Sequence, residues 1–78
     1  MDQLNKQIQD KQTQIAERLQ ELRRAKGFSA YEEFAFKNKI NRSTYGRMEQ
    51  GRNMRMDSFL QALIALDITL EDFHKGLK

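Results

Sequence analysis

Residues 34–51 read Phe-Ala-Phe-Lys-Asn-Lys-Ile-Asn-Arg-Ser-Thr-Tyr-Gly-Arg-Met-Glu-Gln-Gly, and this stretch decides the fold. Asn41 is a suitable N-cap, because its side-chain oxygen can accept a hydrogen bond from a backbone N–H two or three residues later. Gly51 is a suitable helix stop, because glycine adopts the left-handed conformation without steric cost. The stretch therefore predicts the end of one helix, a tight turn over residues 38–40, and a second helix of about nine residues.

The two faces of this second helix differ in chemistry. Tyr45 and Met48 are three residues apart and share a face that can pack on a core. The opposite face carries small, hydrogen-bonding or positively charged residues, namely Ser43, Gly46, Arg47 and Gln50. Such a face suits a DNA major groove, where side chains reach the base edges.

Composition limits the fold and the class of protein. The chain has 78 residues without proline or cysteine, and helix-forming residues dominate, so we expect one small all-α domain. The absence of cysteine excludes disulfides and thiolate metal sites. No apolar run reaches the length of a membrane span or the core of an export signal. We therefore expect a cytoplasmic protein.

The positive charge is concentrated in one segment. The net charge is +3, but residues 57–78 carry two basic and four acidic side chains. Residues 39–55 carry one acid, Glu49, and five basic residues: Lys39, Arg42, Arg47, Arg52 and Arg55. A basic patch of this kind suits a polyanion, and a merely solvated basic surface is the alternative.

The chain resembles the helix-turn-helix DNA-binding domains of the phage-repressor (Cro-like, Xre-type) family. Residues 41–44, Asn-Arg-Ser-Thr, and 47–51, Arg-Met-Glu-Gln-Gly, match the recognition helix and its exit, and residues 15–29 and 59–73 match the flanks. The resemblance implies an all-α, compact five-helix repressor-like domain over residues 15–78, with the helix-turn-helix formed by its second and third helices. It also implies a sequence-specific regulator of transcription that binds double-stranded DNA as a dimer on a palindromic site.

The resemblance and the helix geometry together suggest a role for each matching residue. The expected base contacts are Arg42, Ser43, Gly46, Arg47 and Gln50. The expected phosphate contacts are Tyr31, Asn41, Thr44, Arg52, Asn53 and Arg55. The expected structural residues are Ala35, Tyr45 and Met48 in the core, and Arg23 paired with Glu49. Close helix packing is the alternative for Gly46, and half-buried packing is the alternative for Tyr31.

The first helix of the pair and its turn depart from the family pattern. The segment before Phe34 is one residue longer than usual, and Ser29 with Glu32 forms a capping box that predicts where this helix begins. In the turn, either Asn38 or Lys39 takes the left-handed conformation, which costs about 1–2 kcal/mol for a residue other than glycine.

Phe36 is also unusual, because it lies on the polar side of its helix. An exposed phenylalanine there is covered by the N-terminal extension, covered by a partner subunit, or left exposed, as single apolar residues often are. These three possibilities remain open at the level of the sequence.

The N-terminal residues 1–14 form a polar extension. Leu4 and Ile8 continue the apolar spacing of the first helix, Ile15, Leu19 and Leu22, which is expected to end near Gly27. The extension is therefore a polar tail, a helical continuation packed on its own domain, or a helix that pairs with another subunit.

The C-terminal third predicts two structural helices. The first spans about residues 56–66, with Met56, Phe59, Leu60, Leu63 and Leu66 expected in the core. The second begins at Thr69, with Asp72 as the capping partner and with Leu70 and Phe73 expected in the core. His74, the one histidine, is expected at the surface.

An enzyme is not expected. The chain has no cysteine, one histidine and no glycine-rich phosphate loop, so we expect no catalytic residue, cofactor, metal or small-molecule ligand. The expected partners are double-stranded DNA and a second copy of the chain. The alternative is a protein–protein interaction module, antitoxin-like or a regulatory partner, that keeps the fold and binds through residues 1–14.

Overall fold

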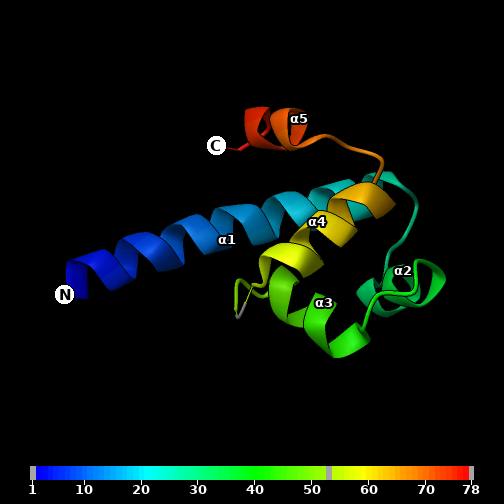
Figure 1. The fold of residues 1–78 in the computed structure, drawn as a ribbon, viewed down its shortest axis with the longest axis horizontal. Coiled ribbons are helices and arrows are strands. Elements are labelled where there is room, and N and C mark those ends of the chain that lie inside the picture. Colours follow the sequence, from blue (N-terminus) through cyan, green and yellow to red (C-terminus); the bar gives the residue numbers. More distant parts are fainter. Residues whose placement is uncertain (1, 53, 78) are drawn as a thin grey trace.

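The computed structural model describes residues 2–52 and 54–77, which contain five α-helices and no strand (Figure 1). The helices are α1 (Asp2–Ala25), α2 (Tyr31–Lys37), α3 (Arg42–Glu49), α4 (Met56–Ala65) and α5 (Leu70–Lys75). The expected all-α fold with five helices is confirmed. Within the described residues, none of the helices combines the length and the apolar character that crossing a membrane requires.

Helix α1 is continuous and has two different halves. Its C-terminal half buries Ala16 and Leu19 against the rest of the molecule. Its N-terminal half, residues 2–11, is exposed throughout, and Leu4 and Ile8 keep about half of their surface in solvent. In Figure 1 this half projects beyond the other helices. Residues 2–14 are thus helical rather than a polar tail, and their pairing with another subunit stays a prediction.

Helix α3 occupies the centre of the fold, where it contacts α1, α2 and α4. Tyr45 of α3 is fully buried and packs on Phe34 of α2, with ring centroids 5.1 Å apart. Phe28 meets the edge of Phe34 in turn, at 5.4 Å. The buried apolar cluster comprises Leu19, Phe34, Ala35, Ile40, Tyr45, Met48, Phe59, Ala62, Leu63, Leu66 and Phe73.

Helix α4 buries a different line of residues from the one expected. Phe59 and Leu63 are buried as predicted, and Leu66 is buried beyond the helix end. Met56 and Leu60 are exposed, so their assignment to the core is wrong. The buried residues recur at spacings of three and four along one face of the helix. Met56 and Leu60 lie on a neighbouring face, which remains exposed.

Helix α5 packs on the side of α1 opposite to α2 and α3 (Figure 1). Thr69 caps it as predicted, since its hydroxyl accepts a hydrogen bond from the Asp72 N–H at 3.1 Å. Phe73 is buried and meets Phe59 edge to face, but Leu70 is exposed, so its assignment to the core is wrong. A helix this short buries one line of side chains only, and Leu70 lies outside that line.

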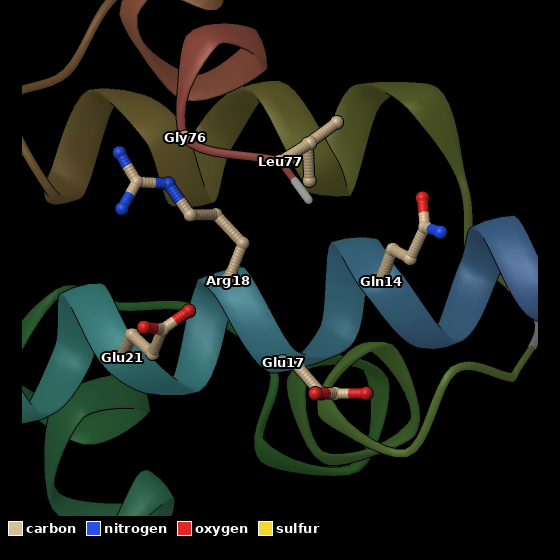
Figure 2. A pocket seen from close by; sticks show the side chains of 6 residues that line it. All are labelled: Gln14, Glu17, Arg18, Glu21, Gly76 and Leu77. Atoms are coloured by element: carbon tan, nitrogen blue, oxygen red, sulfur yellow. The ribbon is translucent and has the colours of Figure 1, made fainter.

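Arg18 of α1 joins α5 to the long helix. Figure 2 shows the Arg18 side chain extending from α1 toward the chain at Gly76. Its guanidinium carbon lies 6.0 Å from the centroid of the Phe73 ring, within the range of a cation–π contact. A Cβ atom at residue 76 would meet this guanidinium, so a larger residue there would require the Arg18 side chain to move.

Helix α2 begins one residue later than the capping box predicts. Ala30 is the N-cap, with an extended conformation (φ −116°, ψ 136°) and no side-chain cap, so the expected box of Ser29 and Glu32 is wrong. Ala30 is therefore extended and lies outside the helix, which begins at Tyr31. Local capping chemistry was outweighed here by the position that Phe34 takes in the core.

The turn between α2 and α3 takes one of its two expected forms. Lys39 adopts the left-handed conformation with φ 57°. Asn38 remains right-handed (φ −102°), and its amide nitrogen donates to the Phe34 carbonyl at 2.9 Å. Gly51 ends α3 with φ 74°, as expected from glycine's tolerance of positive φ.

Candidate nucleic-acid interface

The beginning of α3 is fixed by the cap that the sequence predicts. The Asn41 side-chain oxygen accepts a hydrogen bond from the Thr44 backbone N–H at 2.9 Å, so the predicted N-cap is confirmed. Arg42 and Ser43 follow directly and are exposed, while Thr44 is half-buried. The first turn of α3 contains no acidic residue, so its unpaired N–H groups and Arg42 present positive charge to solvent.

The outer face of α3 consists of exposed polar and basic side chains. Arg42, Ser43, Arg47 and Gln50 are all exposed; Arg47 lies about one turn after Ser43, and Gln50, the C-cap residue, lies about two turns after it. Together they form a continuous polar strip that none of the neighbouring helices covers. Four of the five residues predicted to contact bases are therefore at the surface of one helix.

The inner side of α3 is held to α1 by a buried ion pair. Arg23 Nε lies 2.8 Å from Glu49 Oε2, and Arg23 Nη2 donates to Glu49 Oε1 at 2.8 Å. The same guanidinium donates through Nη1 to the Phe28 carbonyl at 2.9 Å. Both side chains are buried, so the predicted Arg23–Glu49 pair is confirmed. The hydrogen-bonded carboxylate raises the pKa of Arg23 above its ordinary value.

This ion pair changes the electrostatics of the candidate interface. Glu49 is the one acid within residues 39–55, and its charge is buried and neutralised by Arg23. The five basic residues of the same segment are exposed: Lys39, Arg42, Arg47, Arg52 and Arg55. The surface that surrounds α3 is consequently more positive than the sequence count suggests.

Tyr45 anchors α3 beneath this pair. Its side chain is fully buried, as predicted, and so are Met48 and Ala35. The Tyr45 hydroxyl has no hydrogen-bond partner within the described residues. Burial raises the pKa of Tyr45 above its ordinary value, and the neighbouring Glu49 carboxylate raises it further.

Gly46 does not belong to the outer face of α3, which corrects its predicted base contact. It is buried, and a Cβ atom at this position would lie 2.9 Å from Cε2 of Tyr31. Gly46 is thus present because the α2 side chain packs directly on the α3 backbone. Tyr31 is half-buried, because its ring packs α2 on α3 while part of its surface stays in solvent. Its contact with a DNA phosphate stays a prediction.

The exit loop after α3 supplies two exposed arginines beside the N-terminal half of α1. Arg52 and Arg55 line an open hollow of about 570 Å³ together with Gln9 and Gln12 of α1. Arg55 Nη2 also lies 3.2 Å from Asp57 Oδ2, an exposed pair that screens part of its charge. Asn53, another predicted phosphate contact, lies outside the described residues.

The two glutamines at this hollow are site residues that the sequence reasoning missed. Gly51 packs against the backbone of α1 at Gln12, which fixes the exit loop beside the extension. The apolar spacing of Leu4, Ile8 and Ile15 contained the signal, because it places Gln9 and Gln12 together on a neighbouring side of a continuous helix.

No candidate metal site accompanies this surface in the described residues. No group of three His, Asp or Glu side chains is placed to hold a metal ion there. A scan against models of protein families found no match, and searches of curated proteins and of solved structures found no significant match either.

Proposed function

We propose that this protein is a sequence-specific regulator of transcription, of the phage-repressor helix-turn-helix type, that acts in the cytoplasm on double-stranded DNA. Helix α3 enters the major groove, and two copies bind the half-sites of a palindrome. Twofold symmetry places these half-sites about 34–36 Å apart, one turn of the duplex.

One observation carries the proposal: the outer face of α3 is basic and polar, while the one acid of this region is buried. Arg42 and Arg47 are exposed and can each bond a guanine through two hydrogen bonds. Ser43 and Gln50 lie on the same strip and supply further hydrogen bonds to base edges. Because Glu49 is neutralised inside the fold, it does not repel the phosphates.

The phosphate contacts flank this strip on both sides. The beginning of α3 offers its unpaired backbone N–H groups, and the side chains of Asn41 and Thr44, to one phosphate strand. The exit loop offers Arg52 and Arg55 at the other end of the helix. Contacts of this kind fix the register of the protein on the duplex, whereas the strip between them reads the sequence.

The test is selection from a random duplex library at two salt concentrations, followed by binding of the selected site to a double variant. Arg42→Ala with Arg47→Ala is expected to lower affinity at least about 30-fold, since each bidentate contact is worth about 1–3 kcal/mol. The affinity of the native protein is expected to fall with salt by about 0.9 log units per log unit for each phosphate neutralised.

A matched variant separates base reading from net charge. Lys11→Ala with Lys75→Ala also removes two positive charges. Lys11 lines a hollow with His74 of α5, and Lys75 belongs to α5, which lies on the side of α1 away from α3 (Figure 1). This control is expected to retain the selected site with a small change in affinity. Equal losses in the two double variants, or a library without an enriched sequence, would refute sequence reading by α3.

A protein–protein interaction module is the second candidate function. It is favoured by the exposed N-terminal half of α1, where Leu4 and Ile8 keep about half of their surface in solvent. Such a module would bind its partner with residues 2–14 and would lose that binding when they are deleted. The Arg42→Ala, Arg47→Ala variant would leave partner binding intact, which distinguishes this function from DNA binding.

A further inference from the structure

Helix α4 carries an apolar stripe on its outer side that the fold leaves uncovered. Met56, Leu60 and Ile64 are 69%, 36% and 79% exposed, respectively, although each is large and apolar. They follow one another at intervals of four, so they form one continuous ridge along the helix. Contiguous apolar surface of this kind marks a site of interaction more often than scattered single residues do.

The stripe is also free of net charge, unlike the outer face of α3. Asp57 is the one charged residue within α4, and Arg55 lies against it at 3.2 Å. Neither a cation nor an anion therefore opposes the approach of an identical surface. Interface cores are depleted of charge in the same way.

A hollow lies at one end of the stripe, and a protruding side chain lies at the other. The hollow of about 280 Å³ is mostly apolar, and its lining comprises Gln12, Ile15, Met54, Met56, Phe59 and Arg55, the arginine that pairs with Asp57. Ile64, at the other end, is the most exposed of the three stripe residues. The hollow and Ile64 are two turns apart on one helix, with Leu60 midway between them.

We propose that the α4 stripe binds the same stripe of a second copy, with a twofold axis at Leu60. In a twofold interface residue i meets residue j while j meets i, so the Met56 end of each copy faces the Ile64 end of the other. Ile64 of each copy then enters the hollow beside Met56 of its partner copy. A stripe that is symmetric about its midpoint, with a hollow at one end and a protruding side chain at the other, satisfies this requirement.

The geometry of the contact follows from the spacing of the ridge. Two ridges of residues at intervals of four interdigitate at a crossing angle of about −50°, with helix axes about 8–10 Å apart. A stable dimer buries about 800 Å² per partner, which is about 14% of the 5713 Å² surface of this chain. The stripe supplies the apolar centre of such an interface, and the hollow at α1 extends it.

The inference deepens the proposed function, because it names the surface through which two DNA-binding domains would pair. Its test contains no DNA, so the two can fail separately. A stable dimer that binds no specific DNA sequence would support this interface and refute the proposed regulator. Sequence-specific binding by a strict monomer would support DNA recognition by α3 and refute this interface.

Sedimentation velocity of the purified chain tests the interface. Ile64→Glu is expected to raise the dimer dissociation constant about 100-fold or more, because each dimer loses two buried isoleucines and gains two buried charges. Phe36→Glu is the matched control, since Phe36 is 84% exposed but belongs to α2 and not to the stripe. This control is expected to dimerise like the native chain, and both variants are expected to keep native helicity because the replaced residues are exposed.

A single-cysteine variant locates the axis independently. The chain has no cysteine, so Leu60→Cys introduces one thiol. At the axis the two thiols face each other, and mild oxidation is expected to give a covalent dimer from Leu60→Cys but not from Phe36→Cys. A monomeric native chain, equal dimerisation of the two glutamate variants, or equal cross-linking of the two cysteine variants would overturn the proposal.

Discussion

Helices α3 and α4 are consecutive and of similar length, and each buries one face in the same core, yet their outer faces have opposite chemistry. The outer face of α3 presents Arg42, Arg47 and polar neighbours. The outer face of α4 presents an apolar stripe with no net charge. Burial on one side therefore leaves the other side of each helix available for a different partner, which we propose to be a polyanion at α3 and a copy of the chain at α4.

The inner faces differ as well. Helix α4 is held by apolar side chains such as Phe59 and Leu63, whereas α3 adds the buried Arg23–Glu49 pair to its apolar contacts. The pair removes a negative charge from the surface where positive charge is concentrated. In α3 the inner face thus contributes to the chemistry of the outer face, which has no counterpart in α4.

The largest expected effect breaks the buried pair. Glu49→Ala leaves the Arg23 guanidinium buried without its carboxylate, so we expect a loss of about 3–5 kcal/mol in the free energy of unfolding. Urea unfolding measures it. The double variant Arg23→Met with Glu49→Leu replaces both charges by apolar groups and is expected to be near neutral. A loss below about 1 kcal/mol for Glu49→Ala would mean that the pair behaves as an exposed one.

The next effect tests whether Gly46 belongs to the inner or the outer face of α3. On an exposed face, Gly46→Ala would stabilise the helix by up to about 1 kcal/mol. Because Tyr31 covers Gly46, we expect a net loss of about 1 kcal/mol from overpacking instead. In a Tyr31→Ala background the same change is expected to become stabilising, and thermal unfolding of the four proteins gives the sign directly.

A smaller effect compares how the two helices begin. Helix α3 has a side-chain cap from Asn41, whereas Arg55 at the start of α4 provides none. Asn41→Ala is therefore expected to cost about 1 kcal/mol, and Arg55→Ala less than about 0.5 kcal/mol. Chemical denaturation of both variants checks the order, and equal losses would show that the Asn41 cap contributes nothing specific.

The smallest effect at neutral pH concerns the buried hydroxyl of Tyr45. Its pKa is raised in the folded protein, so ionisation of Tyr45 favours the unfolded state. The contribution of the protonated hydroxyl to the free energy of unfolding is therefore fully present below the ordinary tyrosine pKa of about 10 and is lost as the pH rises above it. Tyr45→Phe is expected to match the native stability at pH 7 and to be more stable than the native chain above pH 10, as measured by urea unfolding. Parallel pH profiles for the two proteins would contradict this expectation.

Local sequence signals predicted much of the fold. The caps at Asn41 and Thr69 and the helix stop at Gly51 follow from hydrogen-bonding groups and backbone freedom within a few residues, and the structure contains all three. The Arg23–Glu49 pair joins residues 26 positions apart, and it was predicted through the family resemblance. Most of the candidate interface was predictable for the same reasons, since its residues are adjacent on one short helix.

The failures lie where a residue's environment depends on distant elements. Helical spacing predicted that Met56 and Leu60 lie in the core, but the apolar part of α4 is wider than the face that the rest of the fold buries. In the same way, the sequence could not show that Tyr31 of another helix lies over Gly46.

The sequence by itself determined that the chain is helical, where α3 begins and ends, and which segment concentrates positive charge. Each of these depends on propensity, capping or charge within one stretch of chain. The tertiary structure alone decided that Gly46 is buried, that Met56 and Ile64 belong to an uncovered apolar stripe, and that Gln9 lies beside the exit loop. These depend on which faces meet when the helices pack, because burial is a property of the neighbours that a residue acquires from distant parts of the chain.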